Sequence, residues 1–453
     1  MKRSHAIALL IILTLFALGF RTAYNKVTRT TIQADARQYA FYAYNLYKYG
    51  VYSSEENTTN PKPDSFRSPG YPLFLELTMM VSGVKGFFDT ARLWQAVLSS
   101  LMVPLVFLLG VRLGSGDRIA LVASALTAAS PHLVTLSSYI LTETLFGFLT
   151  LVALILFVET ARRNSLVWAV VTGIVSGFAY LTNEVFLFLP LLLILCAFFV
   201  EKHLSGWTIE NTSERNVVRR PAILAVSILA IFLVFPAVWN IRNSSDSISA
   251  ERSGSQRALN TMAHGSYPGF VYKDPRYKYF PYREDPQIKE YTSSVGNFLR
   301  IFRERVAKRP VRYILWYTFE KPYYLWSWNI LQGKGDVYIY PVKQSLFTMN
   351  SLANADRIAM KIAHPVLMAA CLGGIFLFVF QLGSGKKIFT SSKIAELFLV
   401  MLYITFIYTV FAPWPRYSVP FRPIFYLVAS WSIASMWGVI RNRADEKLVK
   451  EDN

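Results

Sequence analysis

The chain has 453 residues, of which 53% are hydrophobic, 15% aromatic and only 17% charged. Soluble proteins carry about 25% charged residues, and their cores do not hold repeated apolar runs of about 18 residues or more. This composition excludes a soluble enzyme and a disordered scaffold, and it predicts an all-α polytopic membrane protein. The net charge of +19 does not favour a nucleic-acid partner, because membrane proteins concentrate Lys and Arg on their cytoplasmic side.

Ten apolar stretches are near the length that a hydrocarbon layer about 30 Å thick requires. A further apolar stretch, residues 70–83, would reverse the side of every later loop if it crossed, so we predict that it is re-entrant or interfacial. Cys196 and Cys371 both fall inside predicted spans, which leaves the water-exposed parts without a disulfide framework. The predicted spans are residues 5–23, 89–112, 117–136, 141–161, 165–182, 184–200, 221–239, 360–382, 393–411 and 418–440.

Basic residues predict which side each loop occupies. With the N-terminus in the cytoplasm, Arg112, Arg162 and Arg441 and their basic neighbours also lie inside, as the positive-inside rule requires. Both termini are then cytoplasmic, and two segments lie on the outer side, where chemistry would take place. We expect three parts: a membrane module over residues 1–245 with an outer loop at 24–88, an outer segment over 246–359 between spans seven and eight, and a three-helix membrane module over 360–453.

Residues 35–50, DARQYAFYAYNLYKYG, predict an amphipathic helix that lies on the membrane surface. Tyr39 and Tyr42 begin an apolar face with helical spacing, and Gly50 is a typical stop. Asp35, at the start of this helix, has two interpretations. It is either an N-cap, worth roughly 0.5–2 kcal/mol, or a general base that accepts a proton from an acceptor hydroxyl. The composition alone favours the cap.

Arg67 and Glu143 are two further candidates at the predicted outer boundary. Arg67 precedes the bend SPGYPLFL, which contains Tyr71, and its guanidinium fork suits phosphate oxygens; the alternative is an ordinary snorkelling arginine. Glu143 opens span four, where an ionisable group is functional by default. Its alternative role is a first-turn acid that complements the helix dipole, worth under about 1 kcal/mol.

The second outer stretch, residues 240–359, contains about 18 Lys and Arg against about 10 Asp and Glu. The positive-inside rule does not explain this excess in a long outer loop, so it predicts an anionic ligand. Within it, Arg309 to Leu331 interleaves Trp and Tyr with basic residues, which is typical of a helix in the interfacial aromatic belt. The helix is either a plain membrane anchor or a substrate contact. His264 in the same segment is a candidate substrate contact, as is His132 near the end of span three.

Several strings in order carry a family resemblance: the Asp with its tyrosine-rich helix, RSPGYPLFL, SPHLVTLSSYILTETLFGFL, YLTNEVFLFLP, FPAVWNIRN and PRYSVPFRPIFYL. Together they resemble the GT-C glycosyltransferases, in the branch of dolichyl-phosphate-mannose protein mannosyltransferases and bacterial polyprenyl-phosphate sugar transferases. The resemblance covers roughly residues 5–245 and 405–440. It implies that Asp35 is the catalytic base, that Arg67 contacts the lipid phosphate and that Glu143 assists.

The resemblance implies transfer of a sugar from undecaprenyl- or dolichyl-phosphate to a hydroxyl of a glycan, lipid or protein on the outer face of a bacterial or archaeal cytoplasmic membrane, with inversion. Arg67, Arg242 and Arg416 are all predicted at the outer boundary, where they could neutralise the leaving phosphate. Tyr39 and Tyr71 are further candidate substrate contacts. No cofactor is expected, although Mg²⁺ or Mn²⁺ would fit if Asp35, Glu143 and His132 converge.

Two departures from the branch concern the site. Many relatives carry a second acid beside the first, where this chain has Ala34 and Ala36, and many have an arginine where this chain has Asn183 followed by Glu184. Asp35 therefore has no acidic neighbour in sequence.

Three other functions stay open at this point. A transporter or channel would fit the apolar helices, but no internal repeat is visible. A non-catalytic or transport component of an envelope polysaccharide assembly system would share the fold and tolerate the loss of Asp35. An enzyme of similar shape could also ligate a whole glycan.

Overall fold

The computed structural model describes residues 3–28, 30–204, 214–245, 252–277, 279–330, 336–384 and 393–451, together with residues 248, 389 and 391. Within these ranges the regular structure is entirely helical. Six of these helices are long and apolar enough to cross a membrane. The chain is therefore an integral membrane protein of the all-α class, as its composition predicts.

The six long apolar helices account for six of the ten predicted spans, and three shorter apolar helices account for three more. The six are α1 (Arg3–Val27), α3 (Gly70–Leu113), α6 (Glu143–Arg163), the part Pro221–Asn243 of α9 (Glu214–Asn243), α16 (Ser351–Ser384), and Pro415–Arg441, which combines η7 (Pro415–Phe421) with α18 (Arg422–Glu451). The three shorter ones are α7 (Leu166–Thr182), α8 (Leu189–Leu204), which follows η1 (Glu184–Phe186), and α17 (Ile394–Val410).

The span predicted over residues 117–136 is divided in the structure. It forms α4 (Asp117–Ala129) and the short α5 (Pro131–Leu136), which meet at Ser130. Proline fixes its own φ and disfavours a helical conformation in the residue before it, so Pro131 ends α4 and starts α5. The side chain of Ser130 accepts a hydrogen bond from Leu133 N and caps the new helix. The number of membrane crossings stays a prediction.

The predicted surface helix is α2 (Asp35–Tyr49), which ends at Gly50 in a left-handed conformation, as the sequence predicts. The apolar stretch at 70–83 forms the first arm of α3, which reverses at Gly83. The Tyr71 hydroxyl on the first arm donates to Gln95 Oε1 on the second arm at 2.6 Å. This contact shows that the two arms run antiparallel. The first arm therefore returns to the end from which it starts. Its depth in a membrane stays a prediction.

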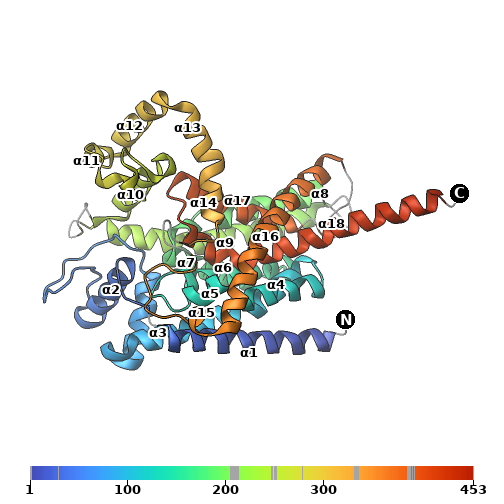
Figure 1. The fold of residues 1–453 in the computed structure, drawn as a ribbon, viewed down its shortest axis with the longest axis horizontal. Helices are drawn as coiled ribbons and strands as arrows, with labels where there is room; N and C mark the ends of the chain where they lie inside the picture. The colour runs from blue at the N-terminus through green and yellow to red at the C-terminus, as the bar shows by residue number, and fades with distance from the viewer. Residues whose placement is uncertain are drawn as a thin grey trace.

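The bundle has two distinct ends (Figure 1). The first turn of α1 and the last turns of α18 lie at one end, whereas α2, α10 (Gly254–Gly265) and α11 (Ile288–Tyr291) lie at the other. The two stretches predicted to be outside also contact each other, since Ser65 N donates to Arg252 O at 3.1 Å. We call the end that carries α2 the α2 end.

The segment between α9 and α16 carries its own small core at the α2 end. It contains α10, three 3₁₀ turns (Pro268–Phe270, Pro275–Tyr277 and Pro281–Arg283), α11, α12 (Val295–Lys308), α13 (Pro310–Leu315), the π-helix η6 (Trp316–Glu320), α14 (Lys321–Trp326) and α15 (Leu346–Met349). Its core residues are Ala263, Tyr267, Tyr291, Phe298 and Ile301.

The aromatic belt over Arg309 to Leu331 stays a prediction, and Leu331 lies outside the described residues. Trp316, Trp326 and Trp328 are all buried within the protein. The Trp316 indole donates to Gly265 O at 2.9 Å, and the Trp326 indole donates to the Thr405 hydroxyl at 2.8 Å. These rings fasten the segment to α10 and α17.

Candidate active site

Asp35 is the first residue of α2, but it does not cap the helix. The N-cap position is Ala34, whose φ of 46° lies in a region that residues other than glycine rarely adopt, and no side chain caps α2. Asp35 Oδ1 instead accepts a hydrogen bond from Arg67 Nη2 at 2.7 Å, and Oδ2 accepts one from Arg416 Nη2. The capping interpretation is therefore wrong, because both carboxylate oxygens are occupied by arginines.

Arg67 lies between Asp35 and Gln38 with its side chain only 14% exposed. Its Nε and Nη2 donate to Gln38 Oε1 at 3.1 and 2.6 Å, while Nη2 also reaches Asp35. The guanidinium lies over the ring of Tyr39, 5.2 Å from its centre. Nε and Nη2 are thus both held by protein acceptors, which an ordinary snorkelling arginine would not require.

Arg416 joins Asp35 to the second predicted acid. It belongs to η7, at the start of the last apolar helix, and its side chain is 13% exposed. Its Nη2 pairs with Asp35, and its Nε lies 3.7 Å from Glu143 Oε1. The backbone N–H of Arg416 donates to Ile330 O at 3.2 Å and fixes the turn. We call Asp35, Arg67, Arg416 and Glu143 the Asp35 cluster.

The Asp35 cluster contains two carboxylates and two guanidinium groups, so its formal charge is zero. Burial favours the protonated form of Asp35, but the charges of Arg67 and Arg416 outweigh burial and lower its pKa below the usual value. Burial likewise opposes the charge on Arg67, yet the Asp35 carboxylate raises the pKa of Arg67. Asp35 and Arg67 are therefore both charged in the resting cluster, and their charges compensate one another.

The predicted contacts Tyr39 and Tyr71 lie behind the arginines. Their ring centres are 5.2 Å apart in an edge-to-face arrangement. Tyr71 is fully buried and is bonded to Gln95, whereas Tyr39 carries the guanidinium of Arg67 on its face. Burial raises the pKa of Tyr39, so it stays neutral beside the cluster.

The structure does not bring Arg242 into the Asp35 cluster. Its Nη1 donates to Asp64 O at 2.6 Å, and its guanidinium lies over the rings of Tyr52 and Trp239, 5.2 and 5.1 Å from their centres. The Asp64 carboxylate is also buried, where it accepts from Tyr42 and Ser54. Arg242 therefore holds the first outer loop against the end of α9.

His132 and His264 also lie apart from the Asp35 cluster. His132 Nε2 is 2.8 Å from Trp328 O, and both side chains are buried. His264 packs among aromatic rings that include Trp414, at 5.2 Å between ring centres, and burial lowers its pKa to about 4. Since Trp414 lies two residues before Arg416, His264 supports the turn that carries this arginine.

The residues proposed for Mg²⁺ or Mn²⁺ do not converge. Asp35 and Glu143 both face Arg416, while His132 is engaged with Trp328. Across the parts of the chain that the structure describes, no three His, Cys, Asp or Glu side chains form a group that could hold a metal. Two carboxylates already paired with a guanidinium do not fit a metal in this arrangement.

Sequence reasoning missed Gln38 and Tyr340, and it named Glu184 without predicting its contacts. Gln38 could have been found, because it lies three residues after Asp35 on the same face of a predicted helix. Tyr340, from an irregular segment, carries no sequence signal; burial and the charge of Asp35 raise its pKa to about 12. Glu184 accepts from Ser68 at 2.9 Å and from Arg257 at 2.6 Å, which gives the departure at this position a structural role.

Residues 78–243 match the family model described as dolichyl-phosphate-mannose-protein mannosyltransferase. The expected resemblance is confirmed over this stretch. It includes Glu143 and Arg242, and it leaves Asp35, Arg67 and Arg416 outside. No curated protein gives a significant match to the chain.

Solved structures share the fold at low identity. The archaeal oligosaccharyltransferase AglB from Archaeoglobus fulgidus, in complex with an inhibitory peptide and a dolichol-phosphate, has a TM-score of 0.54 at 12% identity, over 99% of this chain and 52% of that chain. The apo form of the Archaeoglobus fulgidus oligosaccharyltransferase has a TM-score of 0.53 at 16% identity, over the same shares. The chain thus spans about half the length of these proteins, and the likeness concerns the fold.

Proposed function

We propose that the chain is a membrane glycosyltransferase that transfers a sugar from a polyprenyl-phosphate to an acceptor hydroxyl. The Asp35 cluster carries this proposal, because it joins a carboxylate that can act as a base to two arginines that can hold phosphate. The match over residues 78–243 to the mannosyltransferase family supports it. We place the reaction at the α2 end, on the outer face of a bacterial or archaeal cytoplasmic membrane.

In this proposal the donor phosphate competes with Asp35 for Arg67 and Arg416. An anion between the two guanidinium groups weakens their pairing with the carboxylate, and the pKa of Asp35 then rises toward its ordinary value. A carboxylate with a higher pKa is a stronger base. Donor binding therefore both positions the leaving group and prepares Asp35 to accept a proton.

The transfer itself conserves charge within the site. The acceptor O–H bond breaks, its proton goes to Asp35, and the oxygen bonds to the anomeric carbon of the sugar. The bond from that carbon to the phosphate oxygen breaks, and the phosphate takes the electron pair. As the phosphate changes from one negative charge to two, Asp35 becomes neutral, so the two guanidinium groups still face compensating charge. Glu143 keeps Arg416 oriented, and a single displacement inverts the anomeric centre.

A second candidate is transfer of a whole glycan from a lipid carrier. The shared fold with AglB, described as an oligosaccharyltransferase, is the observation that favours it. The same cluster would serve, since the base and the leaving phosphate play the same parts. A non-catalytic assembly component, in contrast, has no need of an ionised Asp35.

The test is a thin-layer assay of the purified full chain with a panel of radiolabelled polyprenyl-phosphate sugars and lipid-linked oligosaccharides. We expect transfer from at least one donor. Asp35→Asn should lower kcat roughly 10²–10⁴-fold, because asparagine keeps the shape but cannot take the proton. Donor binding should persist, since both arginines remain.

Asp89→Asn is the matched control for this substitution. The side chain of Asp89 is 93% exposed on α3, and the variant should transfer at the unmodified rate. A folded Asp35→Asn protein with full activity would instead indicate that Glu143 is the base or that the chain is an assembly component.

A further inference from the structure

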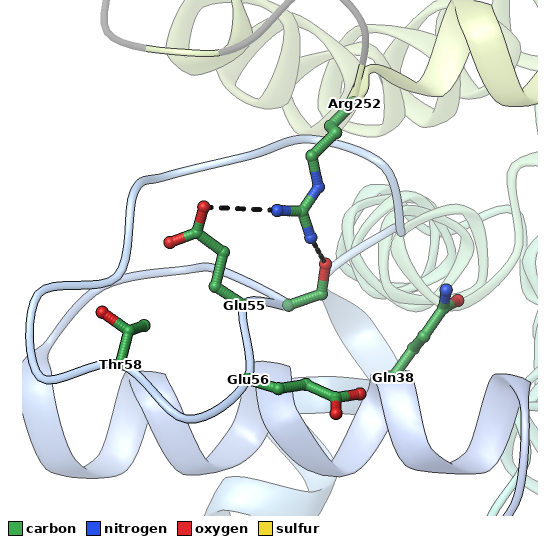
Figure 2. A pocket seen from close by; sticks show the side chains of 6 residues that line it. Gln38, Glu55, Glu56, Thr58 and Arg252 are labelled. Atoms are coloured by element: carbon green, nitrogen blue, oxygen red, sulfur yellow. Dashed lines mark hydrogen bonds and ion pairs between the residues drawn. The ribbon is translucent and has the colours of Figure 1, made fainter.

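A polar cavity of about 460 Å³ opens at the α2 end (Figure 2). Its volume lies in the range of small-molecule sites, which is about 300–1,000 Å³. It lies between α2, the first outer loop and the segment that leads into α10. The six residues that line it are Gln38, Ser54, Glu55, Glu56, Thr58 and Arg252.

The lining is polar, and its charges are compensated. Arg252 pairs with Glu55 at 3.4 Å, as Figure 2 shows, and it also donates to the Ser54 hydroxyl. Glu56 pairs with Arg37 on the outer side of α2. The lining itself holds two carboxylates and one guanidinium, and Arg252 is also paired with the buried Asp64 at 3.2 Å, so the cavity does not favour an anionic ligand. Carboxylate, amide and hydroxyl groups are the partners that sugar hydroxyls require.

Gln38 connects the cavity to the Asp35 cluster. Its Oε1 accepts two hydrogen bonds from Arg67, at 3.1 and 2.6 Å. Among the described residues its NH₂ group has no hydrogen-bond partner, and Figure 2 places its amide at one edge of the cavity. Asp35 lies one helical turn earlier on the same face of α2. A ligand that contacts Gln38 in the cavity is therefore about one helical turn of α2 from Asp35.

We infer that this cavity binds the sugar unit of a neutral carbohydrate acceptor, with Gln38 and Glu56 hydrogen-bonding to its hydroxyl groups. The inference rests on the proposed function, because only a transferase gives that sugar the role of acceptor. The bound sugar presents a neighbouring hydroxyl to Asp35, while the donor phosphate occupies Arg67 and Arg416 on the other side of Gln38.

Two substitutions separate this role from a structural one. Glu56→Gln and Arg37→Gln break the same ion pair, but only Glu56 lines the cavity. The side chains of Arg37 and Glu56 are 55% and 34% exposed, so neither variant should affect folding. A difference between the two variants reports on the ligand.

The probes are methyl α-mannoside, N-acetylglucosamine and lactose, and spermidine serves as a cationic control. Saturation-transfer NMR with the purified full chain in nanodiscs measures their binding. We expect at least one saccharide to bind, and Glu56→Gln to weaken it about tenfold, which is the worth of one hydrogen bond to a charged group. Arg37→Gln should bind it as the unmodified chain does.

Four outcomes would overturn the inference: none of the saccharides binds, the two variants weaken binding equally, only spermidine binds, or Glu56→Gln raises the donor KM and leaves the acceptor KM unchanged. The proposed function fails in a different way. Saccharide binding that depends on Glu56, without transfer from any donor, would reject the transferase and keep the cavity. Transfer that is insensitive to Glu56→Gln would keep the transferase and reject the cavity.

Discussion

Asp35 and Arg416 are separated by 381 positions in the chain, yet they share a hydrogen bond. With Arg67 and Glu143 they form a cluster of two carboxyl and two guanidinium groups. Arg67 also donates to Gln38, so its position does not depend on Asp35 alone. Each arginine has a second partner that can hold it when the carboxylate is released.

The pH dependence of transfer tests the exchange between Asp35 and phosphate. The lowered pKa of free Asp35 means that kcat/KM, which reports the free enzyme, should stay level as pH falls through the ordinary aspartate range near 4. In the donor complex phosphate draws on the two guanidinium groups, so the acid limb of kcat should appear at higher pH. Steady-state rates in liposomes between about pH 3 and pH 8 measure both profiles. Coincident limbs would contradict the exchange.

Arg67→Lys tests whether the site needs the planar guanidinium group of Arg67 and not only its positive charge. Lysine keeps the positive charge but cannot donate in two directions at fixed angles to Asp35, Gln38 and a phosphate. We expect the donor KM to rise about tenfold, with a smaller change in the acceptor KM. Arg37→Lys, on the exposed side of α2, is the control and should leave both constants unchanged. An unmodified donor KM in Arg67→Lys would return this residue to a packing role.

Four of the nine candidate residues chosen from the sequence lie together in the structure. Asp35, Arg67, Glu143 and Arg416 meet because each lies at a helix start or turn that the topology places at the α2 end. Arg242 is predicted at the same boundary, but its guanidinium donates to the carbonyl of Asp64. Its sequence context does not distinguish an arginine that joins the Asp35 cluster from one that holds a loop in place. The end of the bundle at which each candidate residue lies was predictable from the sequence. Its hydrogen-bond partners were not, because they depend on the conformation of the loops.

Among the elements, α2 and the segment around α14 contain the two aromatic patterns of the sequence. The face of α2 that begins with Tyr39 and Tyr42 packs inward, as the helical spacing predicts. In residues 310–326 the π-helix η6 shifts the register, and Trp316 and Trp326 both face the protein. Composition alone does not show which of two apolar environments, lipid or protein, receives a tryptophan.

The reversal of α3 gives a prediction about stability. Gly83 has φ 70° and ψ 171°, a combination that only glycine adopts without strain, and an added Cβ would meet no atom within 4 Å. Gly83→Ala should therefore destabilise the protein by about 1–3 kcal/mol through the backbone alone. Gly19→Ala is the matched control, since its Cβ also meets no atom within 4 Å but its backbone is helical. Thermal unfolding in detergent compares the two, and equal midpoints would contradict the assigned reversal.

For the whole molecule, the contact between the two outer stretches constrains the topology. Arg252 bonds to Ser54 and pairs with Glu55, so the first outer loop and the segment after α9 must lie on the same side of the membrane. The N- and C-terminal helices begin and end at the opposite end of the bundle (Figure 1). This arrangement agrees with the sidedness that the basic residues predict.

Cysteine labelling tests this sidedness. In a background without Cys196 and Cys371, Thr59→Cys and Lys289→Cys should react with an impermeant maleimide from outside intact cells. Asn164→Cys, at the end of α6, should react only after permeabilisation. Labelling of Thr59→Cys only after permeabilisation would reverse the topology and place the site in the cytoplasm.

The span of 381 positions between Asp35 and Arg416 also has a consequence during synthesis. At roughly 5–20 residues per second, the ribosome makes Arg416 some tens of seconds after Asp35. From its own synthesis until Arg416 is made, Glu143 lacks the guanidinium that faces it in the finished protein. Insertion of the last helix therefore supplies the guanidinium that faces both Asp35 and Glu143. A chain that stops before η7 lacks this guanidinium at the α2 end.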